Sequence, residues 1–383
     1  MSNKRKIVVV TGSRADYGLL YWLMKDLNAS NIFELCLVVT GMHLSPEFGL
    51  TVRDIEGDGF SIAARIESLV SSDTGVGIAK SVGVGIIGFA DAIERIKPDL
   101  FLVLGDRFEI FAAAQAALFA GIPIAHIGGG DTTEGAFDEA MRHSISKMAH
   151  VHFVTNSDAA TRLMRMGENP ACIFNVGSPG LDHIHRTNLL PRDILEHELG
   201  YKFKKTNFLI TFHPVTLDEV SSVKQLEELL QALGQIELDV GLIFTQPNSD
   251  TEGRLITERI EAFVASRKNA KLYSSLGNRR YLSVMATVDV VIGNSSSGLY
   301  EAPSLKVPTV NIGLRQQGRL KAESIFDCAP EKESIVQAIE KAMIFDCQKI
   351  VNPFKVGDCA TLILEQLSKI ENFKGLKMKH FFD

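Results

Sequence analysis

The chain has 383 residues, 45% hydrophobic and 22% charged, with a formal net charge of −6 at pH 7. This length predicts two or three domains, and this composition is ordinary for a globular protein with a real core. The negative charge, without a dense Lys/Arg block, argues against a nucleic-acid partner and a polybasic membrane patch. Five widely spaced cysteines without a CxxC motif indicate buried thiols, so we expect a cytoplasmic protein.

Short apolar runs recur along the chain and end in glycine or a polar residue. They are residues 6–14, 34–43, 99–107, 122–131, 151–156 and 172–180, and later 207–214, 240–248, 289–297 and 307–313. Most are continuous rather than alternating, as expected of parallel strands buried on both faces. Helical segments lie between them, including 17–27, 108–119, 138–149, 225–233 and 251–266. This alternation predicts a doubly wound α/β fold.

A polar stretch interrupts the strands between about residue 179 and residue 207. We therefore expect an N-terminal Rossmann-like domain, residues 1–182, and a second one, residues 183–357, facing each other across a cleft. Ligands of open α/β sheets bind at the carboxyl ends of the strands. The residues that directly follow each strand are therefore the candidates for function.

Two patterns resemble ligand motifs but favour other interpretations. Gly83, Gly85 and Gly88 spell GxGxxG, but no strand precedes them and the apolar residues continue at helical spacing, which predicts a buried helix. The HxH pairs at 150–152 and 183–185 have no third ligand in register, so we expect no metal.

Charged residues follow the strands of the first half. Arg14 comes after the first strand, where it could bind an anion or simply lie on the surface. Asp106 ends a very apolar strand and is followed by Arg107. Asp106 could act as a general base or cap the next helix, and the adjacent arginine favours the first role.

The stretch from 126 to 144 is the densest polar cluster. Three glycines are followed by Asp131 and Glu134, and then by Asp138 and Glu139 at the start of a helix. Arg142 and His143 lie four residues further on, so each can face one of these two acids. Ordinary helix ion pairs are the alternative, although so many ionisable groups beside a glycine loop favour a site.

Two segments of the second half favour phosphate binding. His213 follows a strand and could bind a phosphate or transfer a proton, unless it is only structural. The loop GNSSSG, 293–298, lacks the GxSxG spacing of a hydrolase and the lysine of a P-loop. What remains is an anion-binding loop of hydroxyls and backbone N–H groups. Glu301 lies one turn further on, close enough to accept hydrogen bonds from the ribose of a nucleotide. Arg315 and Arg319 follow the next strand, near the same edge.

Together these segments resemble the hydrolysing UDP-N-acetylglucosamine 2-epimerases of sialic acid synthesis. The matching segments are TGSRADYG, VTGMH, LGDRFEI, FDEAMRHSISK, FNVGSPGLD, FHPVT, IGNSSSG with its following Glu, and NIGLRQQGR. The resemblance implies a GT-B-like fold, with a C-terminal helix near 358–383 that returns to the N-terminal domain. It also implies elimination of UDP from UDP-N-acetylglucosamine to 2-acetamidoglucal, followed by hydration to N-acetylmannosamine. It suggests no cofactor and a homodimer or homotetramer.

The resemblance also implies roles for residues. Asp106, Asp131 and Asp138 are the candidate bases, with Glu139 and His213 also in the catalytic set. The diphosphate would be held by Arg14, His213, Ser295, Ser296 and Arg315, with Glu301 on the ribose. Ser297 and Arg319 are further candidates for substrate binding. Arg107, Glu134 and Arg142 would position the substrate or the carboxylates.

One position departs from the family pattern, in which the second residue after the histidine of HIxGG is Glu or His. Here it is Gly128, and Asp131 stands where Glu is usual. Either Asp131 or Glu134 compensates for the missing side chain, or that side chain is dispensable, or the sugar differs. A 6-deoxy, 4-acetamido sugar would need a less polar, roomier pocket, and a glycine would provide room. The alternative substrate is therefore a nucleotide-linked 2,4-diacetamido-2,4,6-trideoxyglucose of legionaminic acid synthesis.

Two other functions are compatible with the same fold. A GT-B glycosyltransferase would need an acceptor sugar and would not release free N-acetylmannosamine. A nucleotide-sugar binding protein without catalysis would not need so many carboxylates in the loop that begins at His126. UDP-N-acetylglucosamine hydrolysis with epimerisation remains the leading prediction.

Overall fold

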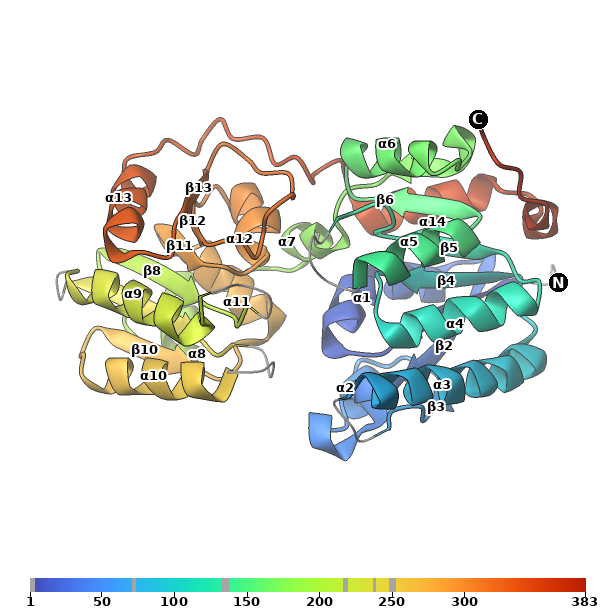
Figure 1. Cartoon of the computed structure of the whole chain (residues 1–383), viewed down its shortest axis with the longest axis horizontal. Coiled ribbons are helices and arrows are strands. Elements are labelled where there is room, and N and C mark those ends of the chain that lie inside the picture. Colours follow the sequence, from blue (N-terminus) through green and yellow to red (C-terminus); the bar gives the residue numbers. More distant parts are fainter. Residues whose placement is uncertain (1–3, 71–73, 133–137, 216–219, 237–238, 248–252) are drawn as a thin grey trace. The chain divides into compact units, whose positions relative to one another are not determined.

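The computed structural model describes the whole chain except residues 1–3, 71–73, 133–137, 216–219, 237–238 and 248–252. The chain divides into two compact units. Unit 1 comprises Met1–Asp182 and Val356–Asp383, and unit 2 comprises His183–Lys355. Each unit contains a parallel sheet with helices on both faces (Figure 1). This confirms the prediction of two doubly wound α/β domains.

Unit 1 contains a seven-stranded parallel sheet of order β3-β2-β1-β4-β5-β6-β7. Its elements up to the fourth strand are β1 (Arg5–Thr11), α1 (Arg14–Ala29), β2 (Phe33–Thr40), η1 (Gly41–Leu44), η2 (Pro46–Phe48), α2 (Val52–Gly57), β3 (Ile62–Ile66), α3 (Gly75–Ile96) and β4 (Leu100–Leu104). Then come α4 (Phe108–Phe119), β5 (Ile124–Ile127), α5 (Asp138–Met148), β6 (Val151–Val154), α6 (Ser157–Arg165), η3 (Pro170–Cys172), β7 (Ile173–Asn175) and η4 (Pro179–Leu181). The strand order reverses between β1 and β4, which pair directly. Such a reversal is where open α/β sheets bind ligands.

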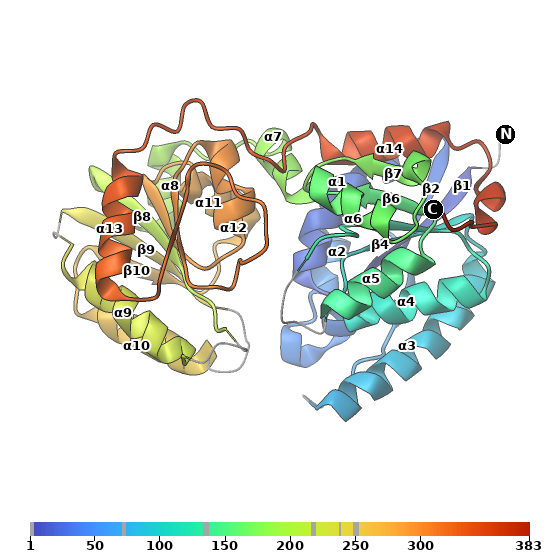
Figure 2. The same cartoon turned by 45° about the horizontal axis from the view of Figure 1, so that its top comes forward.

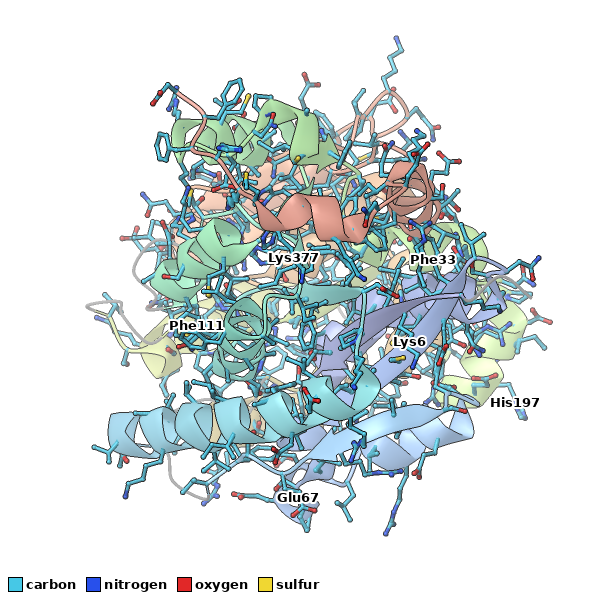
Figure 3. The ribbon with its side chains drawn as sticks, turned by 90° about the vertical axis from the view of Figure 1, so that its right-hand side faces the viewer. Lys6, Phe33, Glu67, Phe111, His197 and Lys377 are labelled. Atoms are coloured by element: carbon cyan, nitrogen blue, oxygen red, sulfur yellow. The ribbon has the colours of Figure 1, made fainter. Side chains whose placement is uncertain are left out.

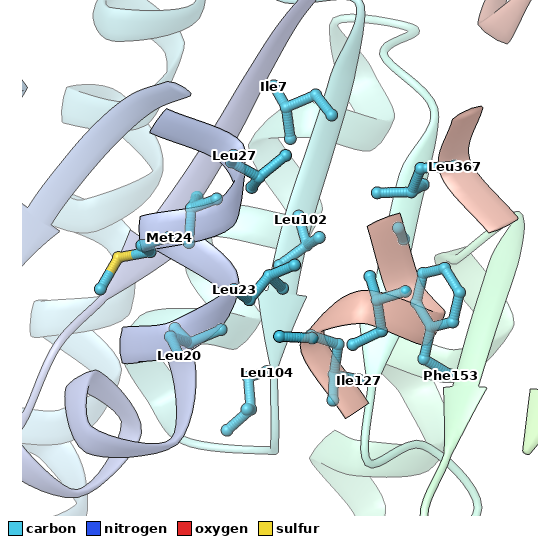
Figure 4. Close-up of a cluster of buried hydrophobic side chains, with 14 of the residues drawn as sticks. Ile7, Leu20, Leu23, Met24, Leu27, Leu102, Leu104, Ile127, Phe153 and Leu367 are labelled. Atoms are coloured by element: carbon cyan, nitrogen blue, oxygen red, sulfur yellow. The ribbon is translucent and has the colours of Figure 1, made fainter. Parts of the chain in front are cut away.

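The C-terminal segment of the chain belongs to unit 1. Helix α14 (Cys359–Lys369) packs against α1 beside the sheet of unit 1 (Figures 1 and 2). It is followed by η6 (Phe373–Lys377), whose Phe373 is buried in the same core. Leu367 joins Leu20, Leu23 and Leu27 of α1 in one buried cluster (Figure 4).

The end of this segment lies against β2. Phe373 stacks on Phe33 with ring centroids 6.4 Å apart, in the part of unit 1 where Figure 3 labels Phe33 and Lys377. Two distant segments of the chain therefore share one core.

Helix α3 confirms the helix predicted across the GxGxxG pattern, but it is not buried all round. It lies along α4 (Figures 1 and 2) and contributes Phe89 and Ile93 to the core, whereas Val84 and Ile87 are exposed. Among the described residues it is the one helix long and apolar enough, by length and composition, to cross a membrane. Its packing against α4 accounts for the apolar residues of one face.

Unit 2 contains a six-stranded parallel sheet of order β10-β9-β8-β11-β12-β13. Its elements start with α7 (Asp182–Arg186), α8 (Arg192–Leu199), β8 (Thr206–Thr211), α9 (Ser222–Gly234), β9 (Val240–Thr245), α10 (Gly253–Ala265), β10 (Ala270–Tyr273) and α11 (Gly277–Met285). They continue with β11 (Val290–Gly293), α12 (Ser297–Tyr300), η5 (Ala302–Leu305), β12 (Thr309–Ile312), β13 (Ile325–Cys328) and α13 (Lys332–Met343). Here the order reverses between β8 and β11, which pair from Val290↔Phe208 to Gly293↔Thr211.

Candidate active site

Asp106 of unit 1 lies just past the carboxyl end of β4, beside the point where the strand order reverses. The N-cap of α4 is Arg107, so Asp106 does not cap that helix. Instead Asp106 forms an ion pair with Arg142, whose side chain on α5 is 7% exposed. A second nitrogen of Arg142, Nη1, donates to the main-chain oxygen of Asp131 at 2.9 Å. Arg142 therefore joins the loops that follow β4 and β5.

Asp138 is the first residue of α5 and lies near this ion pair. Burial raises the pKa of its carboxyl, and the negative charge of Asp106 raises it further, while Arg107 and Arg142 lower it. A carboxyl group with a raised pKa is a better proton donor candidate than an ordinary surface aspartate. Asp138 therefore lies in the electrostatic field of Asp106 and of two arginines, Arg107 and Arg142.

Asp131 is held by the loop after the next strand. Thr155 Oγ1 donates to the two carboxylate oxygens at 2.8 Å and 3.0 Å, and Asn156 Nδ2 donates to Oδ1 at 3.1 Å. Asp131 therefore links its own loop to the loop that follows β6. The sequence prediction missed Thr155 and Asn156, although they follow the strand ending at Val154.

The other two acids predicted in this segment are Glu139 and Glu134. Glu139 Oε1 lies 3.5 Å from His143 Nε2, as the spacing of four residues predicts. Glu134 lies outside the described residues.

Two arginines of unit 1 differ in their surroundings. Arg14, at the start of α1, is 68% exposed and contacts Asp54 at 3.3 Å. Arg107 is 40% exposed and donates through Nε and Nη2 to Oε1 of Glu109, at 3.1 Å and 3.0 Å. The Glu109 side chain is fully buried. The sequence prediction missed Glu109, because an acid in the first turn of a helix is ordinary.

His213 of unit 2 follows β8, and its backbone is fixed by the side chain of Asn294 after β11. Asn294 Oδ1 accepts from His213 N at 2.7 Å, and its Nδ2 donates to His213 O at 2.8 Å. Arg315 Nη1 donates to the main-chain oxygen of Asn294 at 3.1 Å. Burial, together with the charge of Arg315, lowers the pKa of His213 to about 4. His213 is therefore neutral at neutral pH, and its ring can donate a hydrogen bond only as an uncharged imidazole.

The serines after β11 form a chain of hydroxyl groups. Ser295 Oγ lies 3.0 Å from Ser297 Oγ, which lies 2.5 Å from the hydroxyl of Tyr281 on α11. Tyr281 was not predicted, since no signal in the sequence links α11 to this loop. Helix α12 has four residues, so it contributes little dipole, and the N–H groups of its residues Gly298, Leu299 and Tyr300 bond within the loop itself. The expected anion-binding loop thus depends on hydroxyl groups and on the turn around Ser295 and Ser296.

Glu301 ends α12 with one carboxylate oxygen buried. Among the described residues, Oε2 has no hydrogen-bond partner, and burial raises the pKa of Glu301 to about 8. Arg319 donates to Gln316 Oε1 at 2.7 Å, and its guanidinium carbon lies 5.8 Å from the centre of the Tyr300 ring. A neutral carboxyl beside a hydroxyl-lined turn can donate a hydrogen bond as well as accept one.

Known proteins similar to this chain show its family. Residues 25–368 match the family model described as UDP-N-acetylglucosamine 2-epimerase. The chain belongs to this 2-epimerase family. A GDP/UDP-N,N'-diacetylbacillosamine 2-epimerase (hydrolyzing) of Campylobacter jejuni is 40% identical over 88% of each chain. A UDP-N,N'-diacetylbacillosamine 2-epimerase (hydrolyzing) of Legionella pneumophila is 38% identical over 88% of this chain and 89% of its own.

A further relative and a solved structure are also similar to this chain. A polysialic acid biosynthesis protein, P7, of Escherichia coli is 35% identical over 99% of this chain and 97% of its own. A UDP-N-acetylglucosamine 2-epimerase structure from Neisseria meningitidis, bound to UDP-N-acetylglucosamine, has a TM-score of 0.78 at 17% identity and covers 95% of this chain and 100% of its own. At that identity the structural similarity shows the fold alone.

Gly128 is the position at which this 2-epimerase family member departs from the expected pattern. It follows β5, has a φ of 78°, and a Cβ built on it would meet no atom of the residues that the structure describes within 4 Å. The neighbouring His126 is buried, with Nε2 2.8 Å from Gly105 O, and burial lowers its pKa to about 3. His126 is therefore structural, whereas the space at Gly128 is open.

Proposed function

We propose that the chain is a hydrolysing 2-epimerase of UDP-linked 2,4-diacetamido-2,4,6-trideoxyglucose, the sugar of N,N'-diacetylbacillosamine. It would release UDP and the free 2-epimer, 2,4-diacetamido-2,4,6-trideoxymannose. The 40% and 38% identical relatives carry names with this sugar, and both are covered over most of their length. The observation that favours this sugar within the site is the open space at Gly128.

The proposed reaction has two steps. A base removes the C2 proton while the C1–O bond breaks and UDP leaves, which produces a glycal. Water then adds its oxygen to C1, and C2 regains a proton on the opposite face. The net reaction consumes one water molecule.

The residues of unit 1 supply the proton transfers in this proposal. Asp106, which forms an ion pair with Arg142, is the candidate for removing the C2 proton, and Asp138 is the candidate for returning one. Arg107 and Glu139 border this pair, and Glu134 stays a candidate from the sequence. Asp131 organises the loop through Thr155 and Asn156.

The residues of unit 2 stabilise the departing diphosphate. The Ser295–Ser297–Tyr281 hydroxyls, Ser296 and the arginines at 315 and 319 provide donors, and Arg14 of unit 1 remains a further candidate. Preorganised donors aimed at developing charge are usually a large catalytic contribution. His213 would donate to a phosphate oxygen, and Glu301 would bind the ribose.

UDP-N-acetylglucosamine is the second candidate substrate, supported by the 35% identical Escherichia coli relative of polysialic acid synthesis. The two candidate substrates are distinguished by incubating the enzyme with each UDP-sugar in deuterated water and following the products by NMR. We expect the diacetamido sugar to be converted at least about tenfold more efficiently, with deuterium at C2 of the released sugar. Faster release of N-acetylmannosamine would reverse the assignment, and retention of the C2 proton would exclude elimination.

A further inference from the structure

Three loops of unit 1 converge on the carboxylate of Glu109. Glu109 lies in the first turn of α4, beside the carboxyl end of β4. A Cβ built on Gly12, after β1, would lie 3.2 Å from Glu109 Oε1. A Cβ built on Gly41, after β2, would lie 2.9 Å from the same oxygen. The glycines of TGSR and VTGMH thus leave room for this carboxylate.

The carboxylate of Glu109 is buried in an unusual state. Its side chain is fully buried, and Oε2 has no hydrogen-bond partner in the part of the chain that the structure describes. Burial raises its pKa and the charge of Asp16 on α1 adds to this, whereas Arg107 lowers it. A buried carboxylate without a second partner is unfavourable for the fold. A role in function would explain why the chain keeps this carboxylate buried.

The contact that Glu109 makes is with an arginine of the candidate site. Both Nε and Nη2 of Arg107 donate to Oε1, which fixes the plane of the guanidinium. Nη2 also lies 3.5 Å from the sulfur of Met42 in the loop after β2. Arg107 directly follows Asp106, and its charge acts on Asp138. The orientation of Arg107 therefore depends on a carboxylate that is fully buried.

We propose that Glu109 is a positioning residue, which holds the Arg107 guanidinium beside Asp106 and Asp138. This inference rests on the proposed function, because Arg107 acts there on the substrate or on the carboxylate pair. Glu109 itself touches neither. Its effect on the reaction passes through Arg107, which distinguishes it from a residue that only stabilises the fold.

A double-mutant cycle tests this proposal. The rates of wild type, Glu109→Gln, Arg107→Gln and the double variant are measured with UDP-N,N'-diacetylbacillosamine, or with UDP-N-acetylglucosamine if only that is converted. We expect Glu109→Gln to lower kcat about 10-fold with little change in KM, and Arg107→Gln to lower it about 100-fold. The double variant should be no slower than Arg107→Gln alone, because the two residues act as a unit. If the kcat losses of the two single variants multiply in the double variant, the proposal is overturned.

Control variants separate positioning from charge and from stability. Glu94→Gln, at an 86% exposed side chain of α3, should leave kcat and the unfolding midpoint unchanged. Arg107→Lys keeps the charge but cannot offer two coplanar donors, so it should also lose activity. It serves as the test if Glu109→Gln fails to fold, and wild-type activity in Arg107→Lys would overturn the proposal.

A measurement that does not depend on turnover tests the position of Arg107 separately from the proposed function. If the wild type converts neither UDP-sugar, the proposed function fails, and crystal structures of wild type and Glu109→Gln decide the positioning. We expect the guanidinium of Arg107 to leave its wild-type position in the variant. An unmoved guanidinium would overturn the role of Glu109.

Discussion

The carboxylate of Asp106 is paired with Arg142, and it is the proposed base for the C2 proton. We predict that Asp106→Asn lowers kcat by about 10²- to 10⁴-fold, the usual contribution of a general base. UDP should still bind within about threefold of wild type, because the phosphate donors are elsewhere. Release of free sugar is followed by NMR, and UDP binding by calorimetry. Asp91→Asn, on the exposed face of α3, is the matched control, and near-wild-type turnover in Asp106→Asn would remove Asp106 from the mechanism.

Glu301 makes the stability of unit 2 depend on pH. Burial raises its folded-state pKa to about 8. Because the folded chain then binds a proton that the unfolded chain releases, stability is fully present below the unfolded pKa and is lost as pH rises through about 8. Glu301→Gln has no proton to lose, so its stability relative to wild type should grow by about 3 to 5 kcal/mol across this window.

This pH dependence is measured by urea unfolding, followed by circular dichroism, of wild type and Glu301→Gln at several pH values. A constant offset between the two proteins, caused by the new amide, would not affect the slope. The same difference at about pH 5 and about pH 9 would show that Glu301 does not titrate with a raised pKa.

Residues at strand ends could be predicted from the sequence, because parallel strands bring their carboxyl ends to one edge. Asp106, His213 and Ser295 were found in this way, and the structure places each directly after a central strand. The side-chain partners could not be predicted in the same way. Asp131 meets Thr155 only because β5 pairs with β6, and Tyr281 meets Ser297 across sixteen residues.

At the scale of elements, Asp182 ties the start of α14 to the end of the first segment of unit 1. Its two oxygens accept from the backbone N–H groups of Cys359 at 2.7 Å and Ala360 at 2.8 Å. We predict that Asp182→Ala lowers the free energy of unfolding by about 2 to 4 kcal/mol, since two buried donors lose their acceptor. Trp22 on α1, the single tryptophan, reports this in urea by fluorescence.

A second cap on the same helix provides the control for Asp182. Asp358, the N-cap of α14, accepts from Thr361 N at 2.9 Å. Asp358→Ala removes an exposed cap and should lower the free energy of unfolding by about 1 kcal/mol. If Asp182→Ala has no larger effect than Asp358→Ala, the link between the two segments does not stabilise unit 1.

The strands that the sequence did not predict are edge strands. Strands β3, β10 and β13 lie at sheet edges, where half-exposed residues interrupt the apolar runs used to find strands. Central strands such as β4 are buried at all five positions, and these were found. Helix α3 was found, but its exposed face was not, because hydrophobicity does not reveal which side is covered.

At the scale of the whole chain, each unit has buried clusters of its own. Among the residues of α14 and η6, Ile363, Leu367 and Phe373 are buried in the core of unit 1. Local patterns in the sequence do not show where such a terminal segment packs, because the partner surface, on α1, lies more than three hundred residues earlier. The return of this helix was expected only from the resemblance to a family.

Deletion of residues 356–383 should therefore unfold unit 1 and leave unit 2 folded. Removing Ile363, Leu367 and Phe373 from the core loses about 5 to 9 kcal/mol of apolar burial, which is comparable to the whole stability of a domain. We expect the cooperative urea transition of Trp22 fluorescence to disappear, while circular dichroism keeps one transition from unit 2. Deletion of 378–383 alone keeps α14 and should keep both transitions. A truncated chain with the wild-type Trp22 transition would mean that unit 1 is stable without α14, and loss of both transitions would mean that the units do not fold independently.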